Sequence, residues 1–193
     1  MPLSRLGLFV LLLATPALAA DYEIDPDHSS VGFKVKHLAI SNVPGVFSRF
    51  GGRFSFDPAR PEASRVEAAI STSSIDTRHG KRDEHLRSPD FFDTARFPEI
   101  AFASREVRDA SNEGFKLLGD LTIKGVTKPV TLDVSITGSG KDMYGKERTA
   151  FSATTRINRK DFGLTWSKVL ETGALVVGDD VDVTIDIEGI KKG

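Results

Sequence analysis

The sequence contains no cysteine among its 193 residues. Disulfide bonds, thiolate chemistry and lipid attachment through a thiol are therefore excluded. A chain of this length is the size of one domain and can bury a substantial core. Its stability must accordingly come from packing.

An excess of charge of one sign is missing as well. The formal net charge is -1, from 26 Lys and Arg against 27 Asp and Glu. This balance gives no electrostatic reason to expect nucleic acid or an anionic membrane surface as a partner.

Long hydrophobic runs are absent except at the N-terminus, where the run is too short for a transmembrane helix of about 20 apolar residues. Arg5 precedes an apolar stretch at 6–14, and an Ala-Leu-Ala triplet at 17–19 follows Pro16. This pattern predicts a secretory signal peptide over residues 1–19, cleaved after Ala19 or, as a second choice, after Ala20. A buried N-terminal strand or helix is the alternative. Residues 20–193 then form one exported domain with no transmembrane segment.

What the chain does have is alternation of apolar and polar residues with a period of two. Val130, Leu132, Val134 and Ile136 alternate with polar residues. Successive side chains of a strand point to opposite faces, so such a strand has one dry and one wet side. Comparable patterns predict strands near 22–24, 31–37, 47–56, 66–70, 100–102, 115–123, 130–136, 151–157 and 181–187.

About eight strands at hairpin spacing predict an all-β fold with antiparallel pairing. A closed antiparallel barrel of this size can enclose one small ligand, whereas a β-sandwich is the alternative that the pattern leaves open. Polar loops are expected at 42–45 and 138–145.

The segment 76–98 lacks this alternation and is dense in charge. Residues 81–87 predict a short helix with Leu86 as its apolar anchor and Pro89 beyond its end. Phe91 and Phe92 follow between two acids. We expect this segment to form a short helical and loop cap over one mouth of the barrel.

Phenylalanine is the dominant aromatic residue, with 13 Phe against 1 Trp and 2 Tyr. Several fall on the inward parity of predicted strands, which suits either an ordinary core or the wall of an apolar cavity. Few inward positions are polar, so a cavity would favour a long hydrocarbon tail over a sugar or nucleotide. A cavity smaller than about 300 Å³ would instead favour a packed core.

Signals for catalysis or metal binding are weak. The histidines lack metal-ligand spacing, and adjacent triad-type residues at 27–29 cannot all converge, so His28 is expected to make a local hydrogen bond. Asp161 and Glu171 lack a partner carboxylate for glycosidase chemistry. Arg159 and Asp161 are expected to form an ion pair that pins a turn.

The basic residues of 78–87 allow two interpretations. A solvated helix face is the ordinary one. The other is contact with an anionic head group at the cavity mouth, for which the candidates are Arg82, His85 and Arg87.

Specific motifs run along the chain. They comprise Tyr22-x-Ile24-Asp25-x-x-His28-Ser29-x-Val31-x-Phe33-x-Val35-x-His37, Gly45-x-Phe47-x-x-Phe50-x-Gly52, Ser74-Ile75-x-Thr77, Arg82-Asp83-x-His85-Leu86, Asp90-Phe91-Phe92-Asp93, Phe97-Pro98, the stretches 121–130 and 157–163, and Val177-Gly178-Asp179-x-Val181. In combination these motifs, over residues 22–188, resemble the YceI-like family of exported lipid-binding proteins.

This resemblance implies a lipocalin-like barrel whose elongated cavity holds a polyisoprenoid chain, such as an isoprenoid quinone or polyprenyl phosphate, or a similar long-tailed amphiphile. It also implies a non-enzymatic periplasmic role linked to quinone handling or stress, often as a homodimer, with no cofactor beyond a bound lipid or quinone. The residues expected to line the cavity are Phe33, Val35, Phe54, Ile70, Phe91, Phe92, Phe102, Leu117, Leu121, Leu132, Val134, Phe151, Ile157, Phe162, Trp166, Val183 and Ile185.

Two other functions remain open from the sequence. An enzyme acting on lipid head groups would need His28, His37 or His85 as acid or base. A stress-related structural or regulatory protein would have an interior that is only a packed core.

Overall fold

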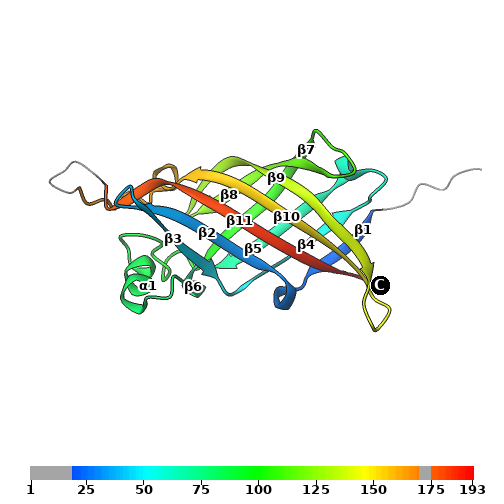
Figure 1. The fold of residues 1–193 in the computed structure, drawn as a ribbon, viewed down its shortest axis with the longest axis horizontal. Helices are drawn as coiled ribbons and strands as arrows, with labels where there is room; N and C mark the ends of the chain where they lie inside the picture. The colour runs from blue at the N-terminus through cyan, green and yellow to red at the C-terminus, as the bar shows by residue number, and fades with distance from the viewer. Residues whose placement is uncertain (1–18, 170–174) are drawn as a thin grey trace, which may run out of the picture.

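The computed structural model describes residues 19–169 and 175–193. The expected signal peptide up to residue 18, and Glu171, lie outside the described residues. Long antiparallel strands form an elongated barrel, with one short helix at the end away from the C-terminus (Figure 1). Among the described residues, no helix is long and apolar enough to cross a membrane.

The described strands form one closed antiparallel sheet of eleven segments. They are β1 (Ala20–Ile24), β2 (Ser30–His37), β3 (Ser41–Phe47), β4 (Phe50–Phe56), β5 (Arg65–Ser71), β6 (Ile75–Asp76), β7 (Glu99–Arg108), β8 (Gly114–Ile123), β9 (Val126–Lys141), β10 (Glu147–Asn158) and β11 (Val177–Lys191).

In three cases, two of these segments together form one interrupted strand of the barrel. β1 and β2 both pair with β11, on either side of a 3₁₀ turn at Pro26–His28. β3 and β4 continue one another across 48–49, and β5 and β6 across a 3₁₀ turn at Thr72–Ser74. The result is an eight-stranded antiparallel barrel, so the predicted fold class is confirmed and the sandwich is excluded.

One predicted loop, 42–45, and the first half of another, 138–145, are strand in the structure. Residues 42–45 belong to β3, which pairs with β6 only at Val46 and Phe47, so Pro44 lies on a free edge where it displaces no ladder hydrogen bond. β9 and β10 extend into a two-stranded ribbon that pairs Lys141 with Glu147, which leaves only 142–146 as the turn. This ribbon has no apolar face, so its sequence lacks the apolar alternation that predicted the other strands.

The capping segment contains the predicted helix, α1 (Gly80–Arg87). His79 caps its first turn by accepting from the Arg82 N–H. The buried Asp83 carboxylate accepts from the Thr77 N–H at 2.9 Å and from the Thr77 hydroxyl, which fixes the helix to the strand before it.

Two apolar clusters occupy the two halves of the interior. The one toward β1 contains Tyr22, Ile24, Phe54, Phe56, Phe115, Leu117, Leu132, Val134 and Ala153. The one toward α1 contains Val31, Phe47, Ile75, Phe91, Ile100, Ile123, Phe162 and Leu164. Ile185 packs against both clusters, so the apolar interior is continuous along the barrel.

Candidate functional site

An apolar cavity with a volume of about 260 Å³ lies inside the barrel. Its wall includes residues from all eleven strand segments, from α1 and from the segment after it. Among the described wall residues, only Ser55, Ser64, Thr155 and Arg159 have polar side chains. Many wall side chains, including Phe102, are only partly buried although they point inward. The cavity therefore exposes hydrocarbon and offers very few polar partners.

Three inward-facing glycines lie beneath phenylalanine rings of this wall, and one of them is Gly189, where a Cβ would lie 2.3 Å from Cζ of Phe54. A Cβ on Gly45 would lie 2.3 Å from Cζ of Phe33, and a Cβ on Gly119 would lie 2.5 Å from Cζ of Phe102. Each phenylalanine ring therefore packs over a neighbouring strand at its glycine, where no side chain occupies the space. In this position the ring covers the wall and leaves space along the barrel axis.

Replacing Gly45 with alanine is expected to push the Phe33 ring toward the axis. Overpacking of this kind destabilises a protein by about 1–3 kcal/mol, and the displaced ring should weaken uptake of a hydrophobic ligand several-fold. Urea unfolding and fluorescent-ligand titration measure the two effects.

Two further variants make this prediction specific. Gly51→Ala is the control, because a Cβ there meets nothing within 4 Å. Phe33→Leu in the Gly45→Ala background should restore part of the loss. If Gly45→Ala and Gly51→Ala had the same free energy of unfolding and the same ligand uptake, the position of the Phe33 ring would not depend on Gly45.

All of the residues expected to line the cavity lie on its wall except Phe162 and Trp166. Phe162 is 2% exposed within the cluster toward α1. Trp166 packs outside the cavity against the rings of His85 and Phe91. Whether the wall residues contact a ligand remains a prediction.

The wall also contains residues that are not among those expected to line the cavity. The inward parity of the strands could have indicated most of the apolar ones, namely Ile24, Val31, Phe47, Phe56, Val66, Ile75, Ile100, Phe115, Ile123, Val130, Ala153, Val177, Val181 and Ile187. No periodic signal indicated Arg159 or Leu164.

The head-group candidates lie outside the cavity wall. Arg82 donates to the carbonyl and hydroxyl oxygens of Thr77, both at 2.7 Å. Arg87 donates to the carbonyl oxygens of Ser73 and Ile75 at 3.0 and 2.8 Å. In this structure Arg82 fastens α1 to the start of the capping segment and Arg87 fastens α1 to the barrel, so head-group contact would require both guanidinium groups to leave these partners.

His85 is the third candidate. Its Nε2 lies 3.0 Å from a carboxylate oxygen of Asp90, and its ring meets the rings of Phe91 and Trp166 edge to face. Since Phe91 belongs to the cavity wall, His85 backs the wall rather than facing the cavity.

Arg159 is the one charged side chain on the wall among the described residues, and it is 4% exposed. Its guanidinium donates to the carbonyl oxygens of Gly178 and Trp166, both at 2.8 Å, and of Leu164. It also pairs with Asp179 at 3.0 Å, so the expected partner Asp161 is wrong. Burial lowers the pKa of Arg159 from its usual value, while Asp179 opposes that shift.

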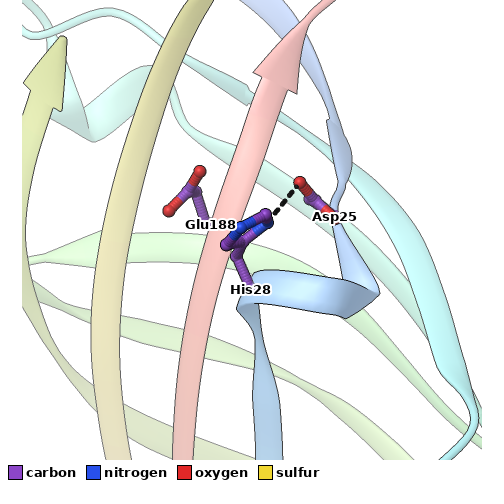
Figure 2. A group of neighbouring side chains, drawn as sticks. All are labelled: Asp25, His28 and Glu188. Atoms are coloured by element: carbon purple, nitrogen blue, oxygen red, sulfur yellow. Dashed lines mark hydrogen bonds and ion pairs between the residues drawn. The ribbon is translucent and has the colours of Figure 1, made fainter. Parts of the chain in front are cut away.

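Asp25, His28 and Glu188 meet on the outer side of the barrel (Figure 2). His28 Nδ1 lies 2.9 Å from Asp25 Oδ2, the local hydrogen bond expected for this histidine. The Arg148 guanidinium donates to Asp25 at 2.7 Å and to Glu188 at 2.6 Å. A cation already sits between the two carboxylates, so the grouping fastens β1, β10 and β11 rather than offering a metal site.

The hydrogen bonds of Arg148 predict a contribution to stability that is lost in acid. Its hydrogen bond is the main cause that lowers the pKa of Asp25. A carboxylate whose folded pKa is depressed stabilises the fold above its unfolded pKa, near 3.9, and loses that contribution as the pH falls through the folded value. Arg148→Met should therefore melt below the wild type at pH 7, and the difference should narrow below about pH 4.

Melting curves from about pH 7 to about pH 2.5 measure this effect. Arg108→Met, at an exposed strand arginine paired with Glu106, is the control and should change little. If the difference in melting temperature between Arg148→Met and the wild type stayed constant with pH, the hydrogen bond of Arg148 would not be what lowers the pKa of Asp25.

With this geometry in place, comparisons with known proteins identify the family. A sequence profile described as the YceI-like domain matches residues 22–189. The chain belongs to the YceI-like family. Its relative Protein YceI from Escherichia coli O157:H7 is 41% identical over 194 residues, which cover 98% of each chain.

Solved structures of the YceI-like fold agree with the barrel. The Campylobacter jejuni YCEI protein is 35% identical, with a TM-score of 0.70 over 83% of this chain and 91% of that one. A polyisoprenoid-binding domain from Saccharophagus degradans, implicated in plant cell wall breakdown, has a TM-score of 0.64 over 91% of this chain and 100% of that one. Its identity is 14%, so this second likeness shows the fold alone.

Proposed function

We propose that this protein binds a long-tailed amphiphile, with a polyisoprenoid as the first choice, in the barrel cavity and carries or sequesters it in the periplasm. The observation that carries the proposal is the apolar wall, to which every strand segment contributes. Such a wall stabilises a hydrocarbon by roughly 25 cal/mol per Å² of apolar surface removed from water. The name of the Saccharophagus degradans domain supports a polyisoprenoid tail, and the expected signal peptide supports export.

The cavity volume favours a second candidate, a structural or regulatory protein with a packed interior. About 260 Å³ is slightly below the roughly 300 Å³ at which ligand pockets commonly begin. A long tail therefore requires wall side chains to move. The phenylalanine rings are the groups that can do so, because Phe33, Phe102 and Phe151 are only partly buried. Ligand uptake decides between the two candidates.

A catalytic function finds less support in the geometry. The cavity wall contains no histidine or carboxylate among its described residues. Of the three histidines that an enzyme would need, His28 is paired with Asp25 on the outer side and His85 packs behind Phe91. We therefore propose a binding protein.

The test uses the mature protein after solvent extraction. We expect native mass spectrometry before extraction to detect a co-purified amphiphile. We also expect the extracted protein to take up a polyprenyl phosphate, measured by displacement of a fluorescent fatty probe. Absence of uptake for prenyl lipids and for fatty amides alike would overturn the carrier function and leave the packed interior.

Location and assembly are tested separately. Fractionation of cells should release the processed chain with the periplasm, and its mass should correspond to cleavage after Ala19. Light scattering tests the homodimer that the family resemblance implies. Neither result depends on ligand uptake.

A further inference from the structure

The turn between β9 and β10, residues 142–146, projects two large apolar side chains into solvent. Met143 is 88% exposed and Tyr144 is 82% exposed, the two most exposed positions of their kind at this end of the barrel. The turn lies beside the C-terminus, at the end of the barrel remote from α1 (Figure 1). Adjacent exposed apolar side chains are a feature of surfaces that contact a partner or a membrane.

The turn is held rigidly in this form by a carboxylate that faces inward. Asp142 accepts from the N–H groups of Tyr144 and Lys146, each at 2.9 Å, and from Arg148 Nε at 3.0 Å. Gly145 supplies the left-handed residue of the turn at φ 78°. Exposure of the Met-Tyr pair is therefore built into the turn and does not result from a loose loop.

Two lysines flank the pair on the turn, although the whole chain is almost neutral. Lys141 and Lys146 flank the tip, and both are exposed. Neither forms a salt bridge with any described residue. The nearest acids are occupied, because Asp142 accepts from Arg148, and Glu147 is paired with Lys191.

Four other acids lie near this end, and one of them, the exposed Asp21, forms no salt bridge with a described residue. Asp25 and Glu188 accept from Arg148, and Glu23 pairs with Lys192. The outermost surface thus combines an aromatic residue, a thioether and two ammonium groups. This combination suits the boundary of a bilayer, where tyrosine rings settle at head-group level and lysines attract anionic lipids.

We propose that this tip is a membrane-contact element, which inserts Met143 and Tyr144 into the interface of a bilayer rich in anionic lipids while Lys141 and Lys146 meet the phosphate groups. A protein partner fits less well, because a specific interface buries about 800 Å² on each side, far more than two side chains supply. Shallow insertion of a few side chains together with cationic attraction gives weak, reversible membrane binding. This proposal does not depend on what the cavity holds.

The test is flotation of the mature protein with vesicles of phosphatidylcholine containing about 30 mol % phosphatidylglycerol, against vesicles of phosphatidylcholine alone. We expect binding to the anionic vesicles that weakens as NaCl rises from about 0.1 M to about 0.5 M. Met143→Ser with Tyr144→Ser should lower the bound fraction at least about fivefold. Lys141→Gln with Lys146→Gln should reduce binding to the level seen with phosphatidylcholine alone.

Ile40→Ser is the matched control, because Ile40 is also 82% exposed but lies after β2 at the other end of the barrel. It should leave flotation unchanged. The proposal is overturned by failure of the wild type to float, by full binding of the Met143 and Tyr144 double variant, or by loss of binding in Ile40→Ser. The double variant should keep the wild-type melting temperature and its uptake of detergent-dispersed amphiphile, so this outcome is separate from that of the proposed function.

Discussion

Replacing Val183 with aspartate is expected to lower the affinity for a long-tailed amphiphile by about 100-fold or more. Val183 lies on the cavity wall in the middle of β11, opposite Phe33 of β2 and Thr155 of β10. A carboxylate there keeps its charge only if water stays with it, and an apolar tail would displace that water. The lost solvation costs several kcal/mol, and each 1.4 kcal/mol is a tenfold change in affinity.

The control for this variant is the next residue of the same strand. Thr184 points outward and is exposed, so Thr184→Asp adds the same charge on the wet side of β11. Its affinity should remain within about twofold of the wild type. Fluorescent-probe displacement measures both variants, and far-UV circular dichroism checks that each one folds.

A second blocking variant protects the result against misfolding. Val183→Trp fills the space with an apolar ring and introduces no charge. If the cavity is the binding site, it should also reduce uptake, with a larger loss for longer tails. Folded Val183→Asp and Val183→Trp proteins that both bind like the wild type would place the ligand elsewhere.

The sequence was sufficient to predict the barrel wall because alternation with a period of two is a direct consequence of strand geometry. In β11, Val181, Val183, Ile185 and Ile187 fall on one parity, and the structure places all four on the cavity wall. Parity is a local property, so it needs no knowledge of which strands pair. The need to hide every dry face is met by a barrel or by a sandwich, so parity alone left that choice open.

The sequence could not show how much of the interior is empty. That depends on pairs from different strands, such as the Phe33 ring over Gly45. Gly45 was assigned to a loop, because Pro44 beside it suppressed the strand signal. The sequence pattern also did not show that β1 with β2, β3 with β4 and β5 with β6 form three interrupted barrel strands, because that depends on which strands pair.

The positions and contacts of the residues that follow β10 were the hardest to predict from the sequence. Phe162 and Trp166 were expected to line the cavity, although neither has a periodic context that indicates where its side chain points. The structure instead puts Phe162 in the packed cluster toward α1. Arg159 was expected to pin a turn, which it does, but its acid is Asp179. That acid lies 20 residues away in the chain, a distance over which sequence spacing carries no information.

Arg159→Met is expected to lower the free energy of unfolding by about 3–5 kcal/mol. The methionine fills similar volume but donates no hydrogen bond. The carbonyl oxygens of Leu164, Trp166 and Gly178 would then lose their guanidinium donor. Asp179 would keep only Lys160, whose Nζ lies 2.7 Å from it. Urea unfolding followed by circular dichroism gives the free energy.

Arg156→Met provides the matched control for this loss. Arg156 lies near the end of β10, three residues before Arg159, and pairs with Asp182 at 2.6 Å, but its side chain is 68% exposed. An exposed pair contributes about 0–1 kcal/mol, so the control should unfold almost like the wild type. Similar losses in the two variants would show that burial does not decide the role of Arg159.

Hydrogen exchange separates the local effect of Arg159 from a general loss of stability. Its bonds join the segment 164–166 to the start of β11, at the end of the cavity that also contains Val177. In Arg159→Met, the amides of 163–168 should exchange faster even at urea concentrations where the barrel strands stay protected. Because Leu164 belongs to the cavity wall, the same loosening should speed release of a bound tail. If exchange became faster to the same extent in all strands and the release rate stayed unchanged, Arg159 would stabilise the whole fold. It would then have no specific effect on the end of the cavity near Leu164.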